Sequence, residues 1–110
     1  MTDEQNQPKD PIPSELVRED ASLADLVEEF LGTIPERLRE METAINSSDF
    51  DILRRRAHQL KGSGGGYGYP AVTELAARLE QQAVGGQLTS CQQALEELHE
   101  LVGRLVVSTD

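Results

Sequence analysis

Four residues of types that could do chemistry together fall within one short stretch of this sequence: Arg54, His58, Lys61 and Gly62. If the stretch is helical, their spacing of three and four places them side by side on one helix surface. His58 lies about 100° around the helix from the apolar Ala57, so its ring is expected on the solvent side. A neutral imidazole is a nucleophile that can accept a phosphoryl group from an acyl phosphate and later release it. The pattern therefore favours a phosphoryl-accepting histidine at position 58.

The residues that follow His58 fit this chemistry. Lys61, one turn further along, would offset negative charge on phosphoryl oxygens. Gly62 inside a helix costs about 1 kcal/mol relative to alanine, which suggests that another molecule must come close to the backbone there. Gly65 would continue the same face if the helix extends that far. Each residue also has an ordinary alternative: a surface histidine, a solvent-facing lysine, or a helix that simply ends at Gly62.

The basic residues of the chain gather around His58. The formal net charge is −10, yet residues 50–70 carry a net positive charge because Arg54, Arg55, Arg56 and Lys61 outnumber Asp51. A strongly acidic chain argues against a nucleic-acid partner, since that binding depends on neutralising phosphates. The cluster is either a solvated face or the docking centre for a partner protein that the acidic remainder helps to orient.

The elements that must position these residues are expected to be helices. Apolar residues recur at steps of three and four in four segments: Leu23 to Ile45, Phe50 to Leu60, Val72 to Ala83 and Leu88 to Leu105. No stretch shows sustained alternation with a period of two. Because the connections are short, we predict an all-α fold, an antiparallel up-down four-helix bundle. The same apolar spacing could instead form a coiled coil between several copies of the chain.

Local signals predict where these helices begin and end. Ser22 is the expected N-cap of the first long helix, and Thr89 with Gln92 could form a capping box on the last. Pro35 predicts a kink in the first long helix, or a break at which a second helix begins. The remaining turns and stops are expected at Asn46–Asp49, Pro70 and Gly85–Gly86.

The chain is expected to form one domain with a polar leading segment. Residues 1–14 predict a flexible N-terminal tail that leads into a short helical turn near 14–19, and residues 15–110 predict the bundle domain. No apolar run has signal-peptide or membrane-spanning length. The single cysteine, Cys91, allows no internal disulfide, so we expect a cytoplasmic location. The starting Met1 and the short C-terminal end would favour a freestanding protein.

The sequence around His58 resembles the signature of histidine-containing phosphotransfer (HPt) domains. Residues Arg56 to Ser63 read RAHQLKGS, and Gly68 closes the loop that follows. The resemblance extends to the helices on either side and covers roughly residues 20–107. The chain departs from the family pattern at Ser63–Gly66, which is unusually rich in glycine and leaves the end of the third helix open.

The resemblance implies a role for each residue of the signature. His58 would be the phosphoacceptor through Nε2, Lys61 the charge partner and Gly62 the small neighbour. From their place on the same helix face, we expect Arg54, Gly62 and Gly65 to contact the partner. The family passes phosphoryl groups between receiver-domain aspartates, or between a histidine kinase or hybrid kinase and a receiver. The Mg²⁺ needed for transfer belongs to the receiver, so no cofactor and no metal site are expected here. We expect a monomer without catalytic activity of its own.

Other signals favour ordinary structural roles. The glycines around Gly66 and Gly68 are not preceded by a strand, which argues against nucleotide binding. His99 is expected at the surface, and Cys91 lies on the apolar stripe of the last helix, where packing is its expected role. Two other functions stay open: a bundle that binds a receiver or kinase without being phosphorylated, and a structural helical dimer.

Overall fold

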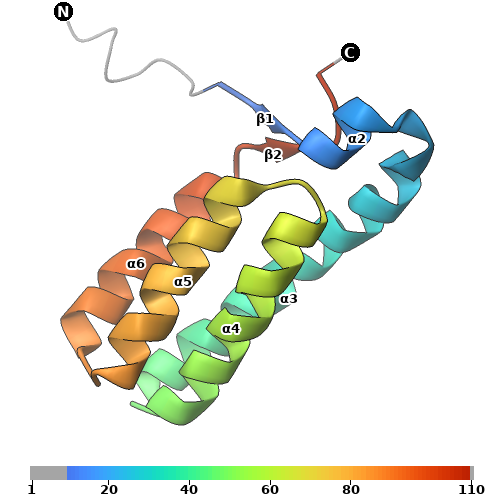
Figure 1. The fold of residues 1–110 in the computed structure, drawn as a ribbon. Coiled ribbons are helices and arrows are strands. Elements are labelled where there is room, and N and C mark those ends of the chain that lie inside the picture. The colour runs from blue at the N-terminus through green and yellow to red at the C-terminus, as the bar shows by residue number, and fades with distance from the viewer. Residues whose placement is uncertain (1–9, 110) are drawn as a thin grey trace, which may run out of the picture.

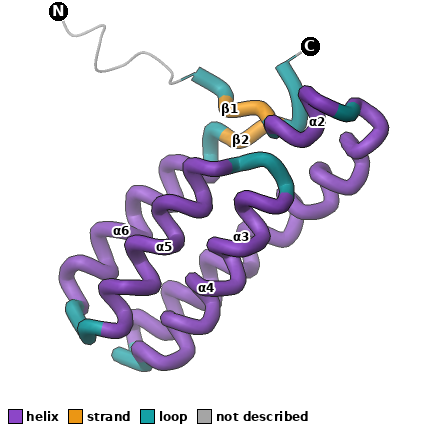
Figure 2. Tube along the Cα trace, in the orientation of Figure 1, coloured by secondary structure: helices purple, strands orange, loops and turns teal. Residues whose placement is uncertain are grey.

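The computed structural model describes residues 10–109. The elements follow one another as β1 (Ile12–Pro13), α2 (Glu15–Glu19), the 3₁₀ helix η1 (Ala21–Leu23), α3 (Ala24–Asn46), α4 (Phe50–Gly66), α5 (Pro70–Val84), α6 (Leu88–Val102) and β2 (Leu105–Val106). The four long helices, α3 to α6, run alternately in opposite directions and pack side by side (Figures 1 and 2). The predicted all-α, up-down four-helix bundle is therefore confirmed.

Three tight turns connect the long helices, as the sequence predicted. Ser48 adopts a φ of 53° in the first turn, and Asp49 Oδ1 then caps α4 by accepting a hydrogen bond from the Ile52 N–H at 3.2 Å. Pro70 opens α5, where its missing N–H costs nothing. Gly86, with a φ of 64°, forms the last turn. The helix α3 continues through Pro35, so the predicted alternative of two separate helices is wrong.

Both side-chain caps predicted for α3 and α6 are wrong. Ser22 lies inside η1, and its N–H and hydroxyl both donate to Asp20 Oδ1, at 3.1 and 2.6 Å. The helix α3 begins at Ala24 without a side-chain cap. Thr89 cannot open a capping box because α6 has already begun at Leu88. In each case a turn earlier in the chain fixes the helix start.

The two ends of the described chain meet at one end of the bundle (Figure 1). The strands β1 and β2 pair in parallel, with Ile12 opposite Leu105 and Pro13 opposite Val106. Leu105 therefore belongs to a strand, although the sequence placed it on the stripe of the last helix. Residues 1–9 of the predicted tail lie outside the described residues. Residues 12–14 belong to the fold, because two of them form β1 and the third is buried. The domain therefore begins earlier than the predicted boundary at 15.

Ser14 ties this junction to the loop between α4 and α5. It is almost fully buried, and its Oγ accepts from the Val17 N–H at 3.2 Å and donates to the Tyr67 carbonyl at 2.7 Å. The buried Tyr69 hydroxyl donates to the Val106 carbonyl at 2.7 Å, and burial raises the pKa of Tyr69 to about 12. The short helical turn predicted near 14–19 is confirmed as α2.

The core is mainly aliphatic, although Phe30 and Tyr69 are also buried. The helices contribute buried side chains that are mainly Leu, Ile, Val and Ala: Val27, Ile34, Leu38, Leu53, Ala57, Leu60, Val72, Ala76, Leu79, Ala94, Leu95 and Leu98. Cys91 is also buried, which confirms its packing role, and burial raises the pKa of its thiol. Within residues 10–109, the helices are too short or too polar to cross a membrane.

Candidate functional site

The helix α4 continues through most of the glycine-rich stretch and ends at Gly66. The alternative in which the helix stops at Gly62 is therefore wrong. The core side of α4 consists of Leu53, Ala57, Leu60 and Gly64, all buried. His58 lies away from that side, and its side chain is 63% exposed, as the sequence predicted.

A carboxylate from the neighbouring helix links His58 and Lys61. Glu80, on α5, has one oxygen 2.9 Å from Nδ1 of His58 and the other 2.8 Å from Nζ of Lys61. The Glu80 side chain is only 16% exposed, so the three groups form a partly sheltered network. Thr73, two turns before Glu80 on α5, donates its hydroxyl to the Lys61 carbonyl at 2.7 Å and holds the two helices in register.

The charge on Glu80 fixes which nitrogen of His58 carries the proton. The hydrogen bond from Lys61 is the largest cause that lowers the pKa of Glu80, and the hydrogen bond from His58 also lowers it. An ionised carboxylate can only accept hydrogen bonds, so Nδ1 of His58 must donate. A neutral ring that donates through Nδ1 leaves a lone pair on Nε2, on the far side of the ring from Glu80. That lone pair can act as a nucleophile.

Glu80 is the site residue that the sequence analysis missed. It directly follows Leu79, a member of the apolar stripe, and looks like one of many acidic surface residues. Glu80 lies seven positions after Thr73, so both residues are on one side of α5, and that spacing is a usable signal. What the sequence alone could not supply is that this side of α5 packs against α4.

The basic cluster around His58 is paired rather than free. Asp51 binds Arg54 at 3.2 Å and Arg55 at 2.8 Å, while Arg56 lies 3.6 Å from Glu40 of α3. With Lys61 bound to Glu80, each of the four cations has an acidic neighbour. Arg54 does lie on α4 one turn before His58, but the cluster forms no patch of unpaired positive charge. Contact of Arg54 with a partner stays a prediction.

The glycines of α4 divide between its two sides. A Cβ on Gly62 or Gly66 would have nothing within 4 Å. A Cβ on Gly64 would lie 2.8 Å from Val72 Cγ1, and one on Gly65 would lie 3.1 Å from Thr73 Oγ1. Gly62 thus stands beside His58 on open backbone, as predicted. Gly65 is exposed at its place beside Thr73 of α5, and contact of Gly62 or Gly65 with a partner stays a prediction.

A shallow hollow lies beside His58. Its lining comes from α2, α3, α4 and the loop after α4: Leu16, Leu26, Arg37, His58, Gln59, Gly62, Ser63, Gly66 and Tyr67. The Tyr67 ring stacks on Phe30 with 4.3 Å between ring centroids, which fixes that wall. Neither Lys61 nor Glu80 lines the hollow. His58 therefore belongs both to the charged network with Glu80 and to the lining of the hollow.

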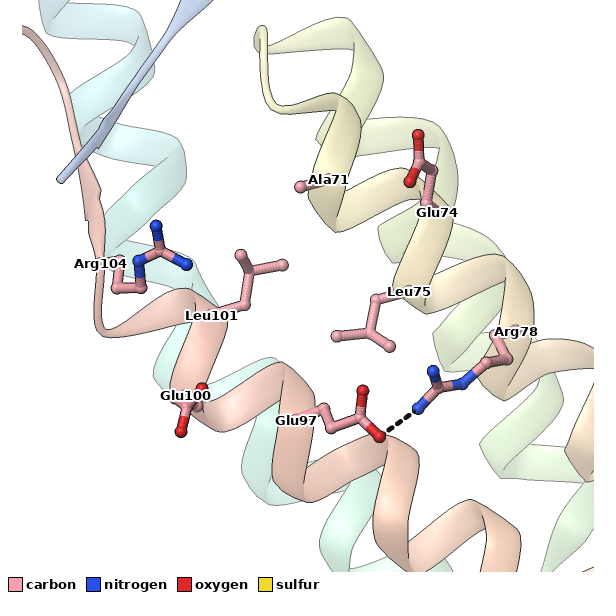
Figure 3. Close-up of a pocket in the computed structure, with 8 residues that line it drawn as sticks. All are labelled: Ala71, Glu74, Leu75, Arg78, Glu97, Glu100, Leu101 and Arg104. Carbon is pink, nitrogen blue, oxygen red and sulfur yellow. Dashed lines mark hydrogen bonds and ion pairs between the residues drawn. The ribbon is translucent and has the colours of Figure 1, made fainter. Parts of the chain in front are cut away.

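A second groove, between α5 and α6, carries no comparable chemistry. Figure 3 shows Leu75 and Leu101 facing each other between the two helices, beside an ion pair of 2.6 Å between Arg78 and Glu97. These charges neutralise each other, and the groove holds no histidine, cysteine or serine. Across residues 10–109, no three side chains of His, Cys, Asp or Glu are grouped to hold a metal ion. His99 lies at the surface of α6, as predicted.

Comparison with known proteins gives one match. The family model described as Hpt domain matches residues 25–107, which include the four long helices almost entirely. The searches of curated proteins and of solved structures gave no match. The matched range begins after α2 and η1, so these two elements lie outside the match.

Proposed function

Because this chain belongs to the Hpt domain family, whose members perform histidine phosphotransfer in phosphorelay signalling, we propose that it carries the phosphoryl group on Nε2 of His58. The observation that supports this most directly is the hydrogen bond of 2.9 Å between Nδ1 and Glu80. It leaves an unprotonated Nε2 on an exposed ring, next to a hollow that a partner can enter. The partners of the family are kinases and receiver domains, and here we propose a receiver domain as one of them.

The transfer needs no base on this chain. The Nε2 lone pair of His58 attacks the phosphorus of a receiver aspartyl phosphate, and the P–O bond to the aspartate breaks with its electron pair going to the carboxylate. Since Nε2 carries no proton, none has to be removed. The product ring keeps its Nδ1 proton and gains positive charge, which Glu80 balances. In the reverse direction the cationic ring is a good leaving group. Mg²⁺ would be held by the receiver.

Lys61 supports this chemistry through Glu80. Its ammonium group lies 2.8 Å from Glu80 and stabilises the carboxylate that orients the ring of His58. We therefore propose Lys61 as a positioning residue rather than as a direct contact of the phosphoryl oxygens. Replacing Glu80 with Gln should slow transfer about tenfold, because an amide no longer fixes the tautomer or balances the ring charge. Receiver binding should not change.

The decisive experiment is to incubate the chain with a phosphorylated receiver domain and Mg²⁺ and measure the phosphate on the chain. The wild type should acquire an acid-labile, base-stable phosphate. A His58→Gln variant should acquire none, whereas His99→Gln, at the other histidine, should label like the wild type. Labelling of His58→Gln would contradict the site. A wild type that binds the receiver but stays unlabelled would instead identify a binding module.

A further inference from the structure

The hydroxyl of Thr73 bonds to a helix other than its own. Within a helix, a threonine hydroxyl commonly donates to the carbonyl three or four residues earlier. Thr33 does so in α3, where its Oγ1 donates to the Phe30 carbonyl at 2.7 Å. Thr73 instead donates at 2.7 Å to the Lys61 carbonyl of α4. The bond therefore joins α5 to α4 and is not explained by the needs of α5 alone.

Two glycines of α4 leave the space that this bond needs. A Cβ on Gly65 would lie 3.1 Å from Thr73 Oγ1, which is closer than ordinary van der Waals contact. A Cβ on Gly64 would lie 3.1 Å from the Thr73 nitrogen and 2.8 Å from Val72 Cγ1. Side chains at these two positions would hold α5 further from α4 and keep the hydroxyl away from the carbonyl. Gly65 therefore has a role that involves no partner protein.

Lys61 is bound by α5 at two points. Its carbonyl accepts the hydrogen bond from Thr73, and its Nζ lies 2.8 Å from Glu80 Oε1. Main-chain carbonyls point towards the C-terminal end of a helix, whereas side chains lean towards its N-terminal end. Because α4 and α5 run in opposite directions (Figure 1), the earlier residue of α5 meets the carbonyl and the later one meets the ammonium group.

These two points limit how far α5 can slide along α4. Thr73 and Glu80 are seven positions apart, which corresponds to about 10 Å of helix. Glu80 must keep one oxygen within hydrogen-bond distance of Lys61 and the other within hydrogen-bond distance of His58. A shift of about 1 Å can carry the contact of 2.9 Å between Glu80 and Nδ1 of His58 beyond that distance. The bond from Thr73 opposes such a shift.

From these contacts we propose that Thr73 and Gly65 are positioning residues that hold Glu80 against His58 and so select the ring form in which Nε2 is free to attack. The inference rests on the proposed function of His58 and adds two residues that act on the ring through Glu80. Without the bond between the helices, Glu80 would change its position relative to the ring. Nδ1 would then lack its acceptor for part of the time, and the two ring tautomers would exchange.

The test observes the ring of His58 directly and uses the full chain without a partner protein. All samples carry His99→Gln, so that His58 is the one histidine left. At about pH 8, where an ordinary imidazole is neutral, the NMR shifts of the two ring nitrogens report which of them carries the proton. The shifts lie far apart in a fixed tautomer and approach each other when tautomers exchange. Labelling by phosphoramidate, a donor too small to need docking, reports the reactivity of Nε2, which attacks the phosphorus as ammonia leaves.

Thr73→Val removes the hydroxyl and keeps the shape of the side chain. It should bring the two nitrogen shifts of His58 closer together and slow labelling about threefold, the size expected for the loss of one hydrogen bond. Thr73→Ser keeps a hydroxyl and should restore both measurements. Gly65→Ala should act in the same direction as Thr73→Val, because its methyl group would press on Thr73 Oγ1.

Two matched variants control for the loss of a hydroxyl and for the addition of a methyl group. Thr33→Val removes a hydroxyl that bonds within its own helix, and Gly32→Ala adds a Cβ that has nothing within 4 Å. Both residues belong to α3. These variants should show the nitrogen shifts and the labelling rate of the parent protein.

Combining Thr73→Val with Glu80→Ala separates positioning from a general structural effect. If Thr73 acts through Glu80, the double variant should be labelled as slowly as Glu80→Ala alone, because the acceptor of the Nδ1 proton is already gone. A merely structural residue would slow labelling by the same factor with or without Glu80, and that result would overturn the inference. Unchanged nitrogen shifts in Thr73→Val, or averaged shifts already in the parent protein, would overturn it as well.

The two proposals fail in different ways. A chain that neither phosphoramidate nor a phosphorylated receiver labels would contradict the proposed function of His58. If Thr73→Val still disturbed a fixed tautomer in that chain, the positioning role of Thr73 would stand by itself.

Discussion

The glycine-rich end of α4 presents two sides that look alike in sequence and differ in structure. Gly62 and Gly66, the open glycines, have empty space where a side chain would begin. The contacting glycines are Gly64 in α4 and Gly68 in the loop that follows it. A Cβ on Gly64 would lie 2.8 Å from Val72 Cγ1, and one on Gly68 would overlap the Leu16 nitrogen.

The difference shows that one residue type serves two purposes within seven positions. On the contacting side glycine is required by packing, because α5 and the N-terminal segment occupy the space of a side chain. On the open side no neighbouring segment requires a glycine, so glycine there lowers helix stability without improving the packing. The open glycines lie next to His58 and the hollow. Access by a partner protein is therefore the explanation that remains for their presence in the helix.

The largest effect is expected at Gly68. Its φ of +93° is unfavourable for any residue with a Cβ, and the added atom would overlap the backbone of Leu16 and Glu15. Gly68→Ala should cost about 3 kcal/mol or more, combining backbone strain with displacement of the N-terminal segment. Urea unfolding would measure the loss, and hydrogen exchange should rise first in residues 12–17. If Gly68→Ala unfolded at the same urea concentration as the wild type, close packing at Gly68 would be contradicted.

Gly64 should give the next largest effect. A methyl group there would press on Val72 and on the Thr73 nitrogen at 3.1 Å, between two helices that pack closely. Gly64→Ala should destabilise the domain by about 2 kcal/mol, even though alanine favours the helix. Thermal unfolding followed by circular dichroism checks the value. An increase in stability would show that α4 and α5 can separate at no cost.

Gly62 should respond in the opposite direction. Gly62→Ala adds no contact and should stabilise the domain by about 1 kcal/mol, the gain expected for alanine inside a helix. Transfer from a receiver should nevertheless slow down, and Gly62→Gln should slow it further while keeping the fold. Thermal unfolding and transfer rates measured on the same samples separate the two effects. A stabilised variant with unchanged transfer would leave the open glycines without an explanation.

The charged network beside the open side should give the smallest effect, one that depends on pH. The pKa of Glu80 lies below its ordinary value of 4.5 in the folded protein, so the carboxylate stabilises the fold above that pH. This stabilisation is lost as the pH falls from about 4.5 through the lowered pKa of Glu80, and it should stay below about 1 kcal/mol. Comparing wild type with Glu80→Gln from pH 7 to pH 3 should show the two curves converging in acid.

Most of the fold could be predicted from the sequence because helix stripes and turn residues are local signals. The four long helices, the turn at Asn46–Asp49 and the start at Pro70 all follow from periodicity and backbone preference. The pairing of β1 with β2 could not be predicted, because two residues are too few for a pattern and their partners are far apart in the chain. The expected capping role of Ser22 fails for a different, local reason, because Asp20 forms a turn two residues earlier.

The site was predictable in its own helix and no further. Arg54, His58, Lys61 and Gly62 share α4, so their spacing alone placed them on one side. Glu80 comes from α5, and Leu16, Leu26 and Arg37 come from α2 and α3. Their positions depend on how helices pack, which single-sequence patterns do not encode. The pairing of Arg56 with Glu40 and of Lys61 with Glu80 was hidden for the same reason, because each pair joins two helices. The pairs that Asp51 forms within α4 lie at spacings of three and four and could have been predicted from the sequence.

The parallel pairing of β1 and β2 has a mechanical consequence. In a parallel ladder the incoming chain before Ile12 and the outgoing chain after Val106 leave from opposite ends of the paired strands. A stretching force applied through the two chain ends would therefore load the flanking hydrogen bonds together in shear, among them Ile12 N–H to Arg104 C=O at 2.8 Å and Ser14 N–H to Val107 C=O at 3.3 Å. The bundle would come under tension only after β1 and β2 had separated. A single-molecule experiment with steadily increasing force would record this separation as an early step of its own.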